Sequence, residues 1–157
     1  MFLDFATWLG GTALSVAFQS HTWLIALLQS IHILAIGVIF TSMVIVALRV
    51  LGKVRSDETL DVVWARFSPL IWGSLAVLAA TGLFLAVGEP VREASALSFW
   101  LKMLLIVAAI AGALMLKRRP SHGLAWAMIL VWLFIIFLGR AIAYDVEVWG
   151  SWHLGGA

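Results

Sequence analysis

A histidine with amide and cationic companions is the feature of this sequence best suited to chemistry. His32 lies within a long uncharged segment, residues 5–48, and Gln29 precedes it by three residues, which places both on one face of a helix. A neutral imidazole binds iron and copper through either ring nitrogen. Lys102 and Arg140 are basic residues within two other apolar segments. Because polar groups are costly in such segments, each needs a partner or a function.

Three kinds of ligand suit these four residues. In a b-type haem protein, His32 would be the axial ligand of the iron, and Lys102 and Arg140 would bind the propionates. Copper(I) would instead use the imidazole together with methionine thioethers. A quinone or a small anionic or lipidic ligand would be held by the two basic side chains. We favour haem b, with Gln29 orienting the site, and we leave copper or no cofactor as alternatives.

A second axial histidine is not evident in the sequence. His21 and His122 lie near the ends of predicted spans rather than within them. His153 would reach the iron only if the C-terminal tail folded back into the bundle. The sequence therefore predicts a five-coordinate haem or an unusual sixth ligand.

The same polar residues also fit a purely structural role. Lys102 and Arg140 would then form ion pairs with acids predicted at the same level of the membrane, namely Glu89, Asp145 and Glu147. Such a network would hold the helices of a non-catalytic structural or accessory subunit together.

The composition identifies the class of protein. Hydrophobic residues make up 64% of the 157 residues and charged residues 11%, against roughly 25% charged in soluble domains. This is the composition of an integral membrane protein. The absence of cysteine excludes disulfides, thiolate metal sites and iron–sulfur clusters. A net charge of +2 is no indication of nucleic-acid binding. No phosphate-binding loop, HExxH or GxSxG motif occurs, so we expect an electron carrier or accessory subunit rather than an enzyme with turnover.

Apolar segments and the charges between them predict four membrane spans. As one helix, residues 5–48 would extend about 66 Å, too far for one span. We expect a break near 10–11 or 19–22, with a helix over about 3–17 lying in the interface. The predicted spans are about 22–48, 67–88, 95–116 and 121–143. The expected fold is all-α, an integral membrane four-helix bundle in which residues 1–157 form a single domain.

The distribution of basic residues predicts the orientation. Seven of the ten Lys and Arg residues lie in segments 49–66 and 117–119, which marks these segments as cytoplasmic. Both termini would then face the periplasm of a bacterial inner membrane. The N-terminus lacks the basic region of a signal peptide and is expected to be retained. The expected partners are the lipid bilayer, a periplasmic redox protein and further copies of the chain in a homo-oligomer.

Several short motifs resemble an uncharacterised family of small four-helix bacterial inner-membrane proteins. In chain order they are Gln29-Ser30-Ile31-His32, Thr81-Gly82-Leu83, Phe99-Trp100-Leu101-Lys102 and Gly139-Arg140-Ala141. The resemblance implies that His32 is the shared candidate ligand, with a polar residue three positions before it, and that Lys102 and Arg140 belong to the family pattern. The chain is more loosely similar to membrane b-type cytochromes and to copper-resistance membrane proteins. It departs from those cytochromes because it lacks opposed histidine pairs in mid-span.

Overall fold

The computed structural model describes residues 2–149, which form helices and no strands. The helices are α1 (Phe2–Gly10), α2 (Ala13–Ser20), α3 (Thr22–Val50), α4 (Leu60–Gly88), α5 (Pro90–Ser95), α6 (Leu97–Arg118), α7 (His122–Ala141), the 3₁₀ turn η1 (Ile142–Tyr144) and α8 (Asp145–Trp149). Four of them, α3, α4, α6 and α7, are long and apolar enough to cross a membrane. The chain is a multi-pass membrane protein built as a helical bundle, as its composition predicts.

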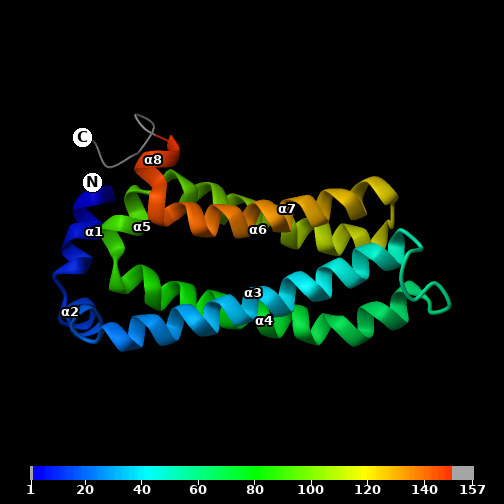
Figure 1. Ribbon diagram of the computed structural model, residues 1–157, viewed down its shortest axis with the longest axis horizontal. Helices are drawn as coiled ribbons and strands as arrows, with labels where there is room; N and C mark the ends of the chain where they lie inside the picture. Colours follow the sequence, from blue (N-terminus) through cyan, green and yellow to red (C-terminus); the bar gives the residue numbers. More distant parts are fainter. Residues whose placement is uncertain (1, 150–157) are drawn as a thin grey trace.

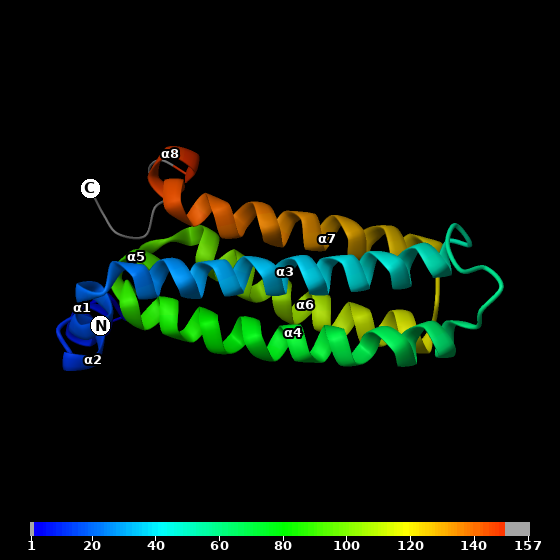
Figure 2. The ribbon, with the colours of Figure 1, turned by 60° about the horizontal axis from the view of Figure 1, so that its bottom comes forward.

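The four long helices run side by side as two antiparallel pairs, α3 with α4 and α6 with α7 (Figure 1). The short helices α1, α2, α5 and α8 gather at one end of the bundle, which we call the short-helix end. The α3–α4 loop and the α6–α7 turn lie at the opposite end, which we call the loop end. The view in Figure 2 shows the same division.

The long helices match the predicted spans, with one difference in α4. This helix begins at Leu60 rather than near residue 67. Thr59 is its N-cap, with a side chain that accepts a hydrogen bond from the Val62 amide at 3.4 Å. The capped helix therefore extends beyond the apolar segment and carries Asp61 and Arg66 at the loop end.

The N-terminal segment forms two helices, where the sequence predicted one over about 3–17. The break falls at residues 11–12, close to the predicted Gly10-Gly11 break. Thr12 has an extended backbone, and its hydroxyl accepts a hydrogen bond from the Ser15 amide at 3.4 Å, so a new helix begins after it. Helix α1 packs on α5, with Ala6 buried. The location of α1 and α2 in the membrane interface stays a prediction.

An apolar core fills the half of the bundle toward the loop end. All four long helices contribute buried side chains to it: Ile39, Met43, Val46, Ala47, Val63, Trp64, Ile71, Ala109, Ala113, Leu116, Ala125, Met128, Trp132 and Ile135. Gly112 on α6 leaves the space that the Met128 side chain of α7 fills, because a Cβ at this position would lie 2.5 Å from the Met128 Sδ atom. The four spans are therefore held together mainly in this half.

Glu58 organises the loop between α3 and α4. Its carboxylate accepts hydrogen bonds from Arg55 at 2.7 Å and Arg66 at 3.1 Å, and its carbonyl oxygen accepts one from Arg49 at 2.5 Å. Three of the seven basic residues predicted on the cytoplasmic side thus surround one acid.

Candidate functional site

The intramembrane histidine is held by a hydroxyl group on the neighbouring helix. His32 lies on α3, and its Nδ1 atom is 2.7 Å from Oγ1 of Thr81 on α4. The Thr81 hydroxyl donates its one proton to the carbonyl oxygen of Val77, also at 2.7 Å. The Thr81 oxygen therefore accepts from His32, which places the ring proton on Nδ1. In this tautomer Nε2 carries the lone pair that can bind a metal.

The imidazole of His32 lies directly against the backbone of α4. Gly82 follows Thr81, and a Cβ at Gly82 would lie 3.6 Å from Cε1 of His32, an ordinary contact distance. The ring is therefore fixed on one side by α4 while remaining partly exposed. Thr81 itself is buried. The sequence did not identify Thr81 as a site residue, although it belongs to one of the resembling motifs.

Lys102 extends from α6 toward α7. Its ammonium nitrogen is 3.7 Å from the position that a Cβ would occupy on Gly139. This is an ordinary contact distance, so the lysine side chain packs against α7 at Gly139. The charge of Lys102 acts electrostatically on His32 of α3 and on Glu93 of α5. The charge of Lys102 thus influences groups on two other helices at the short-helix end.

Glu93 adds a carboxylate that the sequence did not identify as a site residue. It lies on α5, 3.6 Å from the guanidinium of Arg92, which also pairs with Glu89. Burial raises the pKa of the Glu93 carboxyl, the positive charges of Arg92 and Lys102 oppose this increase, and the negative charge of Glu89 adds to it. The only signal in the sequence is an acid one turn after Glu89, at the end of a predicted span.

Gln29 and Arg140, the other two predicted site residues, lie at the edge of this cluster. Gln29 is exposed on α3, one turn before His32. Arg140 is also exposed, with its guanidinium carbon 5.7 Å from the centre of the Tyr144 ring. Within residues 2–149, no hydrogen bond or ion pair joins either of them to His32 or Lys102. Of the four predicted site residues, His32 and Lys102 therefore interact electrostatically, but no hydrogen bond or ion pair within residues 2–149 joins them.

Asp145, proposed above as an ion-pair partner for the basic residues, caps a helix. The amides of Leu97 and Ser98 each donate to its carboxylate at 3.0 Å, and Asp145 is only 4% exposed. The N-cap position of α6 is Ala96, which has no side-chain acceptor. Asp145 on α8 thus supplies the carboxylate acceptor that the N-terminus of α6 needs and that Ala96 cannot provide. The Trp149 indole donates to the Ser98 hydroxyl at 2.8 Å and ties α8 to the same place.

The other histidines do not approach His32. His21 is exposed at the junction of α2 and α3, where Nδ1 lies 2.9 Å from both the Ser20 hydroxyl and the Ala17 carbonyl oxygen. His122 is exposed at the first position of α7, at the loop end. His153 lies outside the described residues. In the described part of the chain, no group of three or more His, Cys, Asp or Glu side chains is arranged to hold a metal ion.

No protein-family model, curated protein or solved structure matches the chain. The class that its fold defines is a multi-pass membrane protein with a helical bundle. At the short-helix end this bundle holds a polar cluster that we call the His–Lys cluster: His32, Thr81, Glu93 and Lys102.

Proposed function

We propose that the protein is a membrane-embedded b-type haem protein, with His32 as axial ligand and a role in electron transfer or redox sensing. The observation that carries this proposal is the 2.7 Å hydrogen bond between His32 Nδ1 and Thr81. A metal-binding histidine commonly donates its second ring N–H to a fixed acceptor, which sets the tautomer and the ring orientation. The contact with Thr81 meets that requirement and leaves Nε2 for the iron.

A single protein ligand favours haem over a bare metal ion. A porphyrin supplies four nitrogen ligands, so one imidazole is enough to attach it. Copper would need further ligands from the protein, and thioethers are the candidates in a chain without cysteine. Met43 and Met128 are buried in the apolar core toward the loop end, where they serve as packing residues. Copper at His32 is therefore the second choice.

Lys102 is the proposed partner of a haem propionate. It is the cation whose charge acts on His32, and it lies on the opposite helix pair. Haem, when bound, supplies one-electron chemistry, and the protein contributes the ligand, the countercharge and an apolar surround. The roles of Gln29 in orienting the site and of Arg140 in binding the second propionate stay predictions.

The location follows from the charge asymmetry. The loop end carries the seven basic residues of segments 49–66 and 117–119, so we place it in the bacterial cytoplasm and the short-helix end at the periplasmic face. Both termini and the His–Lys cluster would then be on the periplasmic side, within reach of a periplasmic redox partner. Membership of the uncharacterised inner-membrane family and assembly into a homo-oligomer belong to the same proposal.

A structural or accessory subunit is the second candidate function. The observation that favours it is that polar residues at the short-helix end join separate helices, as Asp145 joins α8 to α6. In that role the contact of His32 with Thr81 would serve only to hold α3 against α4. A colourless protein would agree with this alternative.

The absorption spectrum of the detergent-purified protein tests the haem proposal. Protein from haem-replete cells is recorded as isolated and after dithionite. We expect a Soret band that shifts on reduction and is absent from His32→Ala. His21→Ala is the matched control, because it removes an exposed histidine from the same N-terminal part of the chain, and it should keep the band. A flat spectrum of the wild type would refute haem binding, and an unchanged band in His32→Ala would refute His32 as the ligand.

A further inference from the structure

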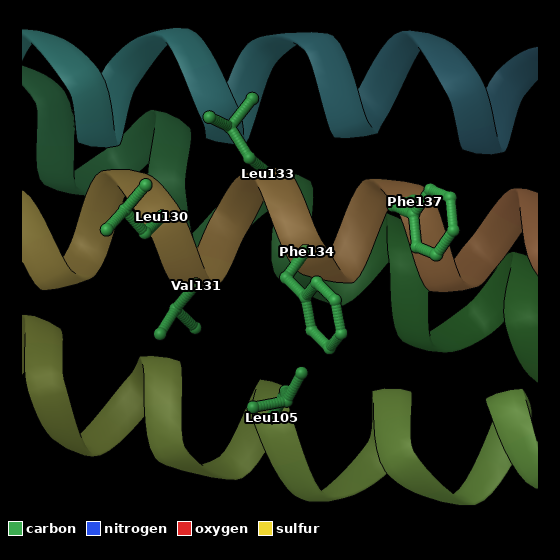
Figure 3. Close-up of a pocket in the computed structure, with 6 residues that line it drawn as sticks. All are labelled: Leu105, Leu130, Val131, Leu133, Phe134 and Phe137. Carbon is green, nitrogen blue, oxygen red and sulfur yellow. The ribbon is translucent and has the colours of Figure 1, made fainter.

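An apolar groove runs along α7 on the surface of the bundle. Its volume is about 530 Å³, within the range of roughly 300–1,000 Å³ typical of ligand sites. Figure 3 shows Val131 and Phe134 extending from α7 toward Leu105 of α6. The complete lining is Leu105, Leu130, Val131, Leu133, Phe134 and Phe137. Every lining side chain is apolar, so a hydrocarbon ligand would fit it without leaving a polar group unpaired.

The shape and chemistry of the lining favour a flexible chain over another helix. Helices pack closely in membranes where small residues let their backbones approach, and this lining consists of Leu, Val and Phe. The rings of Phe134 and Phe137 lie 6.0 Å apart at an angle of 23° and form one stacked pair. An acyl chain can adapt to such a surface by rotation about its own bonds.

A cation lies beyond one end of this apolar face. Arg140 follows Leu133 by seven residues and Phe137 by three, so the helical repeat places it on the same side of α7, toward the short-helix end. Both Arg140 and Tyr144 are exposed, and the guanidinium lies over the Tyr144 ring. Arginine binds phosphate through two parallel hydrogen bonds, and tyrosine is typical of the headgroup level of a membrane.

We propose that this groove binds one acyl chain of an anionic phospholipid whose phosphate is held by Arg140. The apolar lining would contact the acyl chain, and the exposed guanidinium of Arg140 at the end of α7 would bind the negatively charged headgroup. The proposal does not depend on haem. It gives Arg140 a lipid phosphate as its ligand in place of the second propionate, whereas Lys102 lies between the helices and remains the proposed partner of a propionate.

Native mass spectrometry of the delipidated full chain in detergent tests the proposal. The protein is titrated with phosphatidylglycerol or with phosphatidylcholine carrying the same acyl chains. One guanidinium near the membrane surface should favour the anionic lipid by about fivefold. Arg140→Gln should reduce the binding of phosphatidylglycerol to the level of phosphatidylcholine, whereas Arg140→Lys should keep most of the preference. The double variant Phe134→Ala/Phe137→Ala should weaken the binding of both lipids.

Arg119→Gln is the matched control, because it removes an exposed cation at the loop end and should keep the preference for phosphatidylglycerol. Equal binding of the two lipids by the wild type would overturn the proposal. So would an undiminished preference in Arg140→Gln, or an equal loss in Arg119→Gln. A dimer that retains no lipid and becomes monomeric in the double phenylalanine variant would show that a second copy of the chain covers this face.

Discussion

The two halves of the bundle are built on different principles. Toward the loop end, the α3–α4 pair and the α6–α7 pair converge (Figure 1), and their contact is a continuous set of apolar side chains. Toward the short-helix end, the buried side chains include Ser15, Thr81, Ser95, Ser98 and Asp145, and directed hydrogen bonds replace much of the apolar packing. The loop half is a packed apolar core that stabilises the fold, whereas the short-helix half holds polar groups in place through hydrogen bonds, several of which join different helices.

The largest stability effect is expected from breaking the cap on α6. Asp145→Ala removes the acceptor of two amides and should lower the free energy of unfolding by about 3 kcal/mol, because unpaired buried donors are costly. Thermal unfolding in detergent, followed by circular dichroism, measures the loss. Glu147→Ala is the control, since it removes an exposed carboxylate from the same helix and should change stability by less than about 0.5 kcal/mol. Equal effects of the two variants would refute the capping role.

The tight contact of α6 and α7 in the loop half should give the next largest effect. Gly112→Ala places a Cβ 2.5 Å from Met128 Sδ, so the buried Met128 side chain must move to another packing arrangement, at a cost of up to about 1–3 kcal/mol. Gly73→Ala is the control, because it makes the same replacement within a helix where nothing lies within 4 Å. The difference between the two variants in thermal unfolding isolates the packing cost. No difference would mean that the core is looser than the structure shows.

The His32–Thr81 hydrogen bond should have a smaller effect on stability. Thr81→Val keeps the shape of the side chain and removes the acceptor, and we expect a loss of about 0.6 kcal/mol, the average for hydrogen bonds between membrane helices. Thr81→Ser keeps the hydroxyl and should therefore retain most of the wild-type stability. Chemical denaturation of the purified variants measures the change. A Thr81→Val protein as stable as Thr81→Ser would show that this contact adds no stability.

The same pair of variants sharpens the haem proposal. If His32 binds iron, loss of the Nδ1–H acceptor should change the reduction potential and lower the retained haem in Thr81→Val but not in Thr81→Ser. A redox titration followed at the Soret band gives both quantities. Identical potentials in the two variants would mean that Thr81 does not tune the ligand, whereas the absence of haem from all three proteins would refute the proposed function itself.

The smallest effect should be the pH dependence contributed by Glu93. Because burial raises its pKa above the ordinary 4.5, the folded state binds this proton more tightly than the unfolded state does. The stabilisation is therefore complete below pH 4.5 and is lost as the pH rises through the raised pKa. Arg92 and Lys102 limit the effect, and Glu89 increases it. Glu93→Gln should remove this part of the pH dependence of thermal unfolding, and an unchanged profile would contradict it.

Much of the fold could be predicted from the sequence because it depends on length and composition. A span needs about 20 apolar residues, and four such segments occur between clusters of charge. The structure confirms the helical bundle and places four helices long and apolar enough to cross a membrane at the predicted segments. The single helix over 3–17 was not found because Thr12 caps a second one, a local signal that an apolar pattern does not reveal.

The site was predicted only in part. The occurrence of His32 and Lys102 within apolar segments identified them as residues in need of partners, because burial of a polar group is costly anywhere in a membrane. Their partners could not be predicted. Thr81 is 49 positions from His32, and Asp145 is 48 positions from Leu97. Which residues meet over such separations depends on the register and rotation of packed helices.

The sequence by itself thus determined that the chain has four segments long and apolar enough to cross a membrane and that few polar residues lie within them. Hydrophobic length and charge act on each segment separately, so they can be read along the chain. Only the tertiary structure decided that Thr81 orients His32, that Lys102 lies against Gly139, and that Asp145 caps α6. These contacts join different helices, and their geometry is set by the way the helices pack.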